Sequence, residues 1–382
     1  MKTDRNLVPL SEDLMNCSCN FAIMNDVVRK IWFQCIIALV VFTARAQDNW
    51  PSPEVQQMYL HAQEYVAMGN YKDAIVTYKQ VILLAPEKFV LYKGLGKALY
   101  LAGSYSKATE ALKPFMDKPE ADEEFYDLLG ASRAAQKDAK GAKVALKKGL
   151  GRYPSSGLLY HDLGHLYDLE KKSLDALGAW VMGISKDPAY PQSYRDAAIK
   201  YLNGGDVMQG LLYGEVYLNI TSDTSGADAM RKMIFAGYKT MFDDIATNST
   251  TRLGEMGQPA ESFRDAVEKT YLPLTPVVSD GITTENLTMV RTRFLMDWVD
   301  KYAGIYPYSL FAYQDYLVRN GLFDIYNEWL FGKAESVSEY NAWNQFHAGE
   351  MDIFLEKKAA HGLQPASTAV YNDAGMDGKV EE

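Results

Sequence analysis

The feature that most constrains this chain is a spacing of about 34 residues that recurs through its first half. Tyrosine returns at this spacing at Tyr92, Tyr126, Tyr160 and Tyr194. Small residues form two further columns, one at Ala62, Gly96, Gly130 and Gly164 and one at Ala74, Ala108, Ala142 and Ala176. Proline occupies a fourth column, at Pro86, Pro154 and Pro188. Several columns at one spacing predict an array of structural repeats.

Each repeat is predicted to be a helical hairpin. Small residues let two helices approach closely, and proline ends the second helix because it cannot continue one. Gly69-Asn70 and Gly103-Ser104 mark turns between the helices. These columns resemble the tetratricopeptide repeat (TPR). The resemblance covers five units, at 55–88, 89–122, 123–156, 157–190 and 191–224, and the fifth unit is degenerate. A single hairpin cannot bury its apolar face alone, so we expect neighbouring units to stack.

Residues 225–361 are predicted to be helical without an evident repeat. Apolar residues recur at helical spacing within 230–244, 260–271, 285–303, 307–320, 322–331 and 336–360. The predicted fold class is therefore all-α: a TPR-type α-solenoid of helix–turn–helix repeats, followed by an aromatic-rich α-helical C-terminal extension. Residues 362–382 are polar and lack a packing period, so they are predicted to be disordered.

Residues 1–46 are predicted to be a targeting segment. An uncharged, mostly apolar run of fourteen residues at 31–44 is shorter than the ~20 that a spanning helix requires. Arg29 and Lys30 precede it, and Ala44-Arg45-Ala46 follows it. This pattern indicates a signal peptide at about 24–46, with 1–23 as a start-site artefact, although a buried helix or a membrane anchor is an alternative. The mature chain would begin with the repeat region, 47–224, and would have no transmembrane helix.

Composition and charge narrow the choice of compartment and partner. All three cysteines precede the predicted cleavage point, which favours export to the periplasm or outer envelope of a bacterium over a disulfide-rich setting. The net charge is −10, from 39 Lys and Arg against 49 Asp and Glu. This balance disfavours nucleic acid as a partner. We expect a protein or peptide partner, and no cofactor.

The TPR resemblance implies that a partner segment binds on the concave face lined by the first helix of each repeat. Ten residues are predicted to line that face: Tyr59, Gln63, Lys93, Lys97, Tyr100, Asp127, His161, His165, Asp168 and Arg195. The family's best-known binding mode clamps a C-terminal carboxylate with Lys, Asn and Arg. Here Lys93 and Lys97 lie one helical turn apart, but the asparagines are missing, so an ordinary solvated helix face is favoured over such a clamp.

His161, His165 and Asp168 are expected to share one helix face, because they are four and three residues apart. Zinc sites use histidines at this spacing together with a third ligand from elsewhere. Here Asp162 follows the first histidine, where hydrolytic zinc enzymes carry glutamate, and the sequence identifies no third ligand. The prediction is therefore a pair of groove histidines, and no metal.

The C-terminal region is rich in aromatic residues, with sixteen in the 61 positions of 294–354. Such side chains commonly form cores, so we expect a helical cap in which some tyrosines line a groove. The chain contains no nucleophile-elbow, P-loop, dinucleotide-binding or zinc-protease pattern, and no catalytic residue is predicted. The predicted function is a non-catalytic scaffold or adaptor in the cell envelope. The alternative is a protein acting on glycans or small molecules, possibly an enzyme, with acids among Asp297, Asp300, Asp315, Asp324, Glu328 and Glu350.

Overall fold

The computed structural model describes residues 50–247, 260 and 262–366. All regular elements among these residues are helices, which confirms the all-α fold class for the described part of the chain. The predicted signal segment lies outside the described residues, and so does the predicted tail from 367 onward. The chain divides by compactness into two units, one up to Leu95 and the other from Gly96.

The first unit contains one complete helical hairpin. Its helices are α3 (Pro53–Ala67) and α4 (Tyr71–Leu84), and α5 (Phe89–Leu101) begins in this unit. Ser52 caps α3 by accepting a hydrogen bond from the Val55 N–H at 3.4 Å. Ala62 of α3 and Ala74 of α4 are both fully buried. Two helices can approach closely at such positions, as the column of small residues requires.

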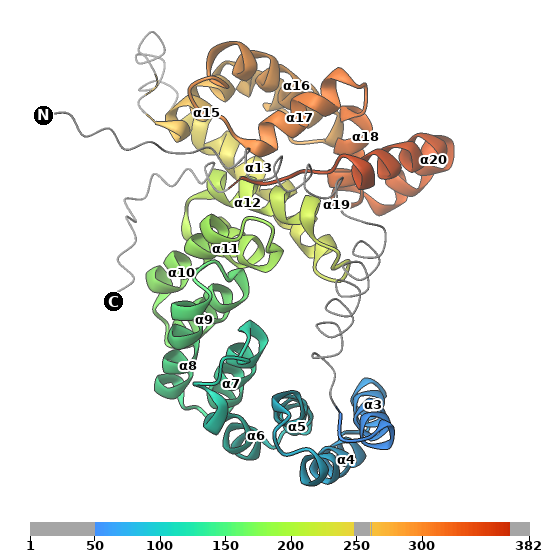
Figure 1. The fold of residues 1–382 in the computed structure, drawn as a ribbon. Coiled ribbons are helices and arrows are strands. Elements are labelled where there is room, and N and C mark those ends of the chain that lie inside the picture. Colours follow the sequence, from blue (N-terminus) through green and yellow to red (C-terminus); the bar gives the residue numbers. More distant parts are fainter. Residues whose placement is uncertain (1–49, 248–259, 261, 367–382) are drawn as a thin grey trace, which may run out of the picture. The chain divides into compact units, whose positions relative to one another are not determined.

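The second unit continues the hairpins in chain order, and adjacent helices pack as pairs (Figure 1). The helices are α6 (Tyr105–Leu112) with the short η1 (Lys113–Phe115), α7 (Glu123–Ala135), α8 (Ala139–Arg152), α9 (Gly157–Leu169), α10 (Ser173–Lys186), α11 (Pro191–Gly204) and α12 (Val207–Ile220). The first helices of successive pairs begin at residues 89, 123, 157 and 191. The period seen in the sequence is thus the length of one helix pair.

A left-handed residue separates the two helices of every pair. Gly69, Gly103 and Gly205 have φ of 75°, 72° and 104°, and at the same column Lys137 and Lys171 have φ of 63° and 61°. Glycine adopts this conformation without the steric penalty that other residues pay. The turn geometry is therefore repeated even where the glycine is not.

The columns of small residues lie where helices touch. A Cβ at Gly130 would come within 2.8 Å of the Leu146 side chain, and a Cβ at Gly164 within 2.3 Å of Trp180 Nε1. Ala108, Ala142 and Ala176 are fully buried. Larger side chains at these positions would push the paired helices apart.

The region after the repeats consists of further helices. They are α13 (Ala227–Thr247), α15 (Phe263–Tyr271), η2 (Leu272–Val278), α16 (Thr284–Lys301), α17 (Ser309–Arg319), α18 (Phe323–Asn327), the π-helical η3 (Glu328–Gly332), α19 (Lys333–Glu335) and α20 (Val337–Ala360). Among the described helices, none combines the length and the apolar character that a membrane span needs.

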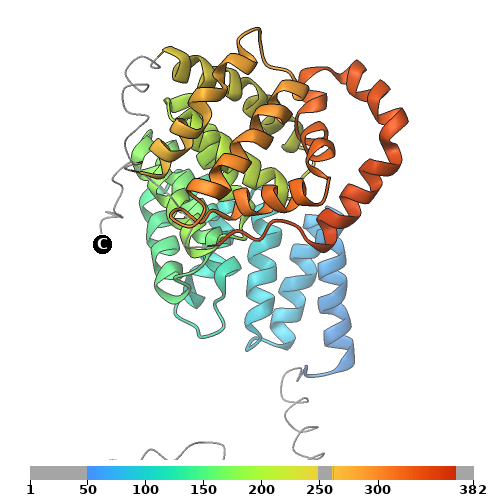
Figure 2. The ribbon, with the colours of Figure 1, turned by 90° about the horizontal axis from the view of Figure 1, so that it is seen from above.

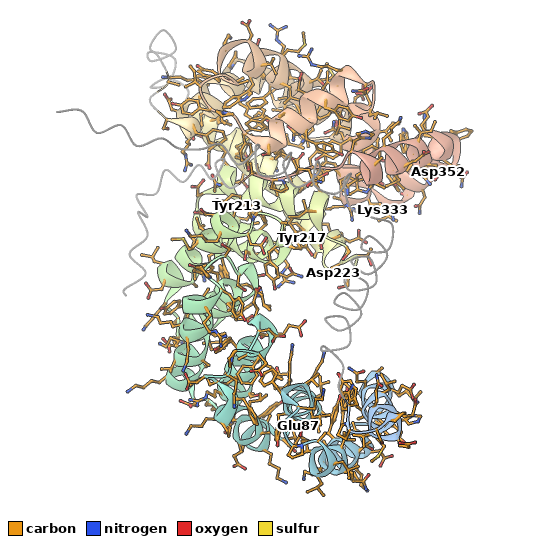
Figure 3. All side chains as sticks on the ribbon, in the orientation of Figure 1. Glu87, Tyr213, Tyr217, Asp223, Lys333 and Asp352 are labelled. Carbon is orange, nitrogen blue, oxygen red and sulfur yellow. The ribbon has the colours of Figure 1, made fainter. Side chains whose placement is uncertain are left out.

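One hydrophobic core joins the last repeats to this region. The core runs from Ala176 to Leu363, with no break at the predicted boundary of 224/225. Helix α12 shows why, because all of its residues from Val207 to Asn219 are buried. Tyr213 and Tyr217 on this helix are labelled in Figure 3. A helix that is buried all round needs neighbours on every side, so α12 belongs equally to the fifth repeat and to the C-terminal helices.

Most of the C-terminal aromatic residues are core residues. Trp298 and Tyr326 are at most 1% exposed, and Phe294 stacks on Tyr271 with ring centroids 4.2 Å apart. Helix α20, red in Figure 2, is the exception, since only two of its residues are buried. Residues 362–366, the start of the predicted tail, are described, and Leu363 is buried. The packed part of the chain therefore reaches beyond Gly362.

Candidate functional site

In the first unit, the predicted binding residues lie on α3 and α5. Gln63 donates a hydrogen bond from Nε2 to the Tyr59 hydroxyl at 2.8 Å. The ring of Tyr59 stacks on Trp50, with centroids 5.0 Å apart. Gln63 is exposed and Lys93 is half-buried. Tyr59 and Gln63 thus provide an aromatic and a polar side chain on α3, the first helix of the first pair.

In the second unit, the remaining predicted residues lie on four successive first helices. We call these residues the first-helix face; they are Lys97 and Tyr100 on α5, Asp127 on α7, His161, His165 and Asp168 on α9, and Arg195 on α11. Burial, with Tyr105 and Asp127 nearby, raises the pKa of Tyr100. Lys97 is exposed. Asp168 accepts a hydrogen bond from Lys200 Nζ at 2.6 Å.

Two histidines of the first-helix face converge on one carboxylate. His161 Nε2 lies 3.0 Å and His165 Nε2 lies 2.9 Å from the same oxygen, Asp196 Oδ2. Burial opposes the charge of Asp196, but hydrogen bonds from His161, His165 and Arg195 hold the pKa of this carboxyl well below its usual range. Asp196 is therefore an anionic centre between α9 and α11.

The Nδ1 side of the His161 ring faces Asp162, which in turn interacts with Asp127. His161 Nδ1 lies 3.3 Å from Asp162 Oδ1. Burial favours the neutral ring, but hydrogen bonds to Asp162 and Asp196 outweigh it and raise the pKa of His161. Burial, together with a hydrogen bond to Asp162 and repulsion from it, raises the pKa of Asp127 to about 8. Repulsion between the two carboxyls thus favours the protonated form of Asp127.

Neighbouring aromatic residues fix the orientation of both histidines. Trp180 of α10 donates its indole N–H to the His161 carbonyl oxygen at 3.1 Å, and its ring lies edge-on to His165. Tyr190, which precedes α11, lies edge-on to His161 with centroids 5.6 Å apart. The absence of a side chain at Gly164 makes room for the indole. The packing between α9 and α10 thus positions the imidazoles.

The polar cluster contains residues that the sequence predicted for the first-helix face and others that it did not predict. Tyr100, Asp127, His161, His165 and Arg195 belong to one polar cluster, in which electrostatic interactions link neighbouring first helices. Asp168, expected on the same helix face as the histidines, pairs with Lys200 of α11. Asp196 and Tyr190 were not predicted. A signal for Asp196 was present, because it lies one repeat length after Asp162 and so occupies the same repeat column.

The nitrogen and oxygen atoms that meet between α9 and α11 are of the kinds that bind a metal ion. Among the described residues, His161, His165 and Asp196 are the one set of three whose donor atoms lie close enough to share a metal ion, all within 4.8 Å of one another. Two imidazoles and a carboxylate are ligands that borderline metals such as zinc accept.

A second polar cluster lies inside the core and has a structural character. The Glu215 carboxylate accepts hydrogen bonds from the Arg291 guanidinium, from Gln314 Nε2 at 2.6 Å and from the Tyr326 hydroxyl at 2.6 Å. Asn327 accepts a second hydrogen bond from Arg291. Glu215 and Arg291 are each 1% exposed. The carboxylate and the guanidinium neutralise each other. Because both are buried, a partner protein cannot contact them.

Three of the six acids considered for a catalytic alternative form ion pairs within their own helix. Asp297 pairs with Arg293, Asp315 with Arg319 and Glu350 with His347, each partner lying on the same helix. Asp300 and Asp324 are exposed. Burial, with repulsion from Glu335, raises the pKa of Glu328. These described acids give no shared centre comparable to the one between α9 and α11.

The repeated pairs, constant in length and with small residues at their contacts, define an all-α repeat protein of the TPR type. No protein-family model and no curated protein matches the chain. Solved structures with partial likeness include MamA, at 24% identity over 41% of this chain and 92% of that chain, with a TM-score of 0.36. TTC0263, a TPR protein from Thermus thermophilus, has 16% identity over 48% of this chain and 98% of that chain, with a TM-score of 0.39. PilF from Pseudomonas aeruginosa has 14% identity over 55% of this chain and 94% of that chain, with a TM-score of 0.42. At these scores, the likenesses add nothing to the fold that the helices already define.

Proposed function

We propose that this protein is a non-catalytic interaction scaffold that binds a segment of a partner protein on the first-helix face. The observation that carries the proposal is the convergence of Tyr100, Asp127, His161, His165 and Arg195 from four successive first helices. Stacked repeats present such side chains as an extended surface that a peptide or helix of a partner can follow.

The chemistry of the face favours a partner segment with both charged and hydrogen-bonding groups. Lys97 and the half-exposed His165 offer donors, while the acids around His161 offer acceptors. Tyrosine and arginine are frequent anchors in protein interfaces, and the face includes both in Tyr100 and Arg195. A uniformly acidic or basic partner would fit this mixture less well.

We further propose that the protein works in a bacterial cell envelope after export. The support is the sequence pattern alone: a short apolar run with Arg29 and Lys30 before it and Ala44-Arg45-Ala46 after it. N-terminal sequencing of the protein from its native cells tests this, and an N-terminus at Gln47 is the expected result. An intact N-terminus in a cytoplasmic fraction would contradict export.

The binding proposal is tested by matched charge reversals on the two kinds of helix. Lys97→Glu alters the first-helix face, whereas Lys107→Glu makes the same charge change on the exposed side of α6. Partner recovery in affinity purification from the native cells should fall severalfold for Lys97→Glu and stay unchanged for Lys107→Glu, because like charges brought together across an interface weaken it. Equal recovery with both variants would exclude Lys97 from the binding surface.

A second candidate function is glycan binding by α20. Tyr340, Trp343 and His347 form a continuous stack along this helix, with centroid distances of 5.9 and 4.5 Å. Phe346 beside them is 86% exposed. Quenching of tryptophan fluorescence by an oligosaccharide, lost in Trp343→Ala, would favour this candidate. No change across a panel of envelope glycans would reject it.

A further inference from the structure

The atoms that converge between α9 and α11 have the composition of a metal site. His161 and His165 lie one turn apart on α9, and Asp196 comes from α11 in the next repeat. Both histidines direct Nε2 at Asp196 Oδ2. The two imidazole nitrogens and the carboxylate oxygen therefore lie close enough together to surround one cation.

We propose that His161, His165 and Asp196 bind one divalent transition-metal ion, with Zn²⁺ the ion that fits best. Zinc takes imidazole nitrogen and carboxylate oxygen at about 2.0–2.2 Å, usually in tetrahedral geometry. Two ligand atoms at a tetrahedral centre are then ~3.3 Å apart. The two nitrogen–oxygen distances here are 3.0 and 2.9 Å, a few tenths of an ångström shorter than that spacing, and all three donor atoms lie within 4.8 Å of one another.

The surrounding groups orient the ligands as the outer shell of a metal site does. Asp162 Oδ1 faces His161 Nδ1 at 3.3 Å. A proton on Nδ1 leaves the lone pair of Nε2 directed at the centre, which is the arrangement of a carboxylate–histidine–metal triad. Arg195 Nε donates to Asp196 Oδ1 at 2.7 Å. This bond holds the carboxylate while leaving Oδ2 for the ion.

Arg195 competes with an ion for the Asp196 carboxylate. Its Nη2 lies 3.3 Å from Asp196 Oδ2, so a cation would share that oxygen with a guanidinium. The contact is longer than the 2.7 Å bond to Oδ1. It is therefore the contact that an ion would displace, while the shorter bond remains.

The site is reachable from the side of His165. The His165 side chain is 48% exposed, whereas Asp196 is 9% exposed, so the ion would enter from the side of His165. Three protein ligands leave one tetrahedral position open. A bound ion would join α9 of the fourth repeat to α11 of the fifth and stabilise this stretch of the array.

The test uses the full chain, purified without a polyhistidine tag and stripped of metal with a chelator. Titration calorimetry with Zn²⁺ should give one ion per chain. Co²⁺ should produce the visible absorption of a tetrahedral site. His165→Ala removes a ligand and should weaken Zn²⁺ binding about 100-fold or more, whereas Asp162→Asn removes only an orienting group and should weaken it about 10–100-fold.

The matched control is His61→Ala. His61 faces Glu64 at 3.0 Å in an exposed histidine–carboxylate pair on one helix, and this change should leave binding as in the unaltered chain. Circular dichroism checks that the variants remain folded, which we expect for the half-exposed His165. The proposal is overturned if the unaltered chain takes up no ion, or if His165→Ala binds Zn²⁺ as tightly as the unaltered chain does.

Discussion

Replacing Lys171 by glycine should make this protein more stable. Lys171 has φ of 61° and is exposed, so the change relieves the backbone and removes no buried contact. A left-handed conformation costs a residue other than glycine about 1–2 kcal/mol. Glycine loses about 0.4–1 kcal/mol by being freer in the unfolded chain. The expected net gain is about 0.5–1 kcal/mol, and Lys137→Gly should behave in the same way.

Urea denaturation followed by circular dichroism measures this gain. If the free energy of unfolding falls by about 3 kcal/mol per molar urea, the midpoint urea concentration should rise by about 0.2–0.3 M for each change. Lys239→Gly is the control, because Lys239 is an exposed residue within α13 and glycine inside a helix costs about 1 kcal/mol. Gly103→Ala should also destabilise the protein, because φ there is 72° and alanine disfavours this conformation. The added Cβ would meet no atom within 4 Å, so the cost comes from the backbone and not from a clash. If Lys171→Gly lowers the midpoint as Lys239→Gly does, the turn is not left-handed and the reasoning fails.

Two further changes test the core. Arg291→Met should cost about 3–5 kcal/mol in urea denaturation, because it leaves the Glu215 carboxylate buried without its counter-charge; a loss under about 1 kcal/mol would show that the pair is not buried in solution. Burial, with Asp206 nearby, raises the pKa of Tyr201 to about 12, and in the unfolded chain tyrosine ionises near pH 10. The stabilising contribution of the neutral phenol is complete below about pH 10 and falls by about 1.4 kcal/mol per pH unit up to about pH 12. Absorbance at 295 nm should therefore show a fraction of tyrosines that ionise only as helicity is lost; titration of all tyrosines near pH 10 with the helices intact would contradict this.

The repeats could be predicted from the sequence because each column has a local physical cause. Gly164 must be small because the Trp180 indole occupies the space of its Cβ, and a constraint that recurs in every hairpin appears as a period. The same logic failed at Lys137 and Lys171. There the stacked helices impose the left-handed turn, although the residue does not favour it.

The remaining features depend on contacts between distant parts of the chain. Glu215 and Arg291 are 76 residues apart, and no spacing rule links an acid on α12 to a base on α16. Asp196 was within reach through its repeat column, but its role follows only from the stacking of α11 on α9. The sequence predicted the kind of surface on the first-helix face, whereas the pairing within it required the fold.

Site-specific photo-crosslinking in the native cells tests the central claim of partner binding most directly. A photoreactive amino acid placed at Lys97 or at Gln63, both exposed on first helices, is compared with one at Lys107 or at Lys140, on second helices. We expect a crosslinked partner band from the first-helix positions and none from the second-helix positions. A partner captured from Lys107 and Lys140, but not from Lys97 and Gln63, would contradict it.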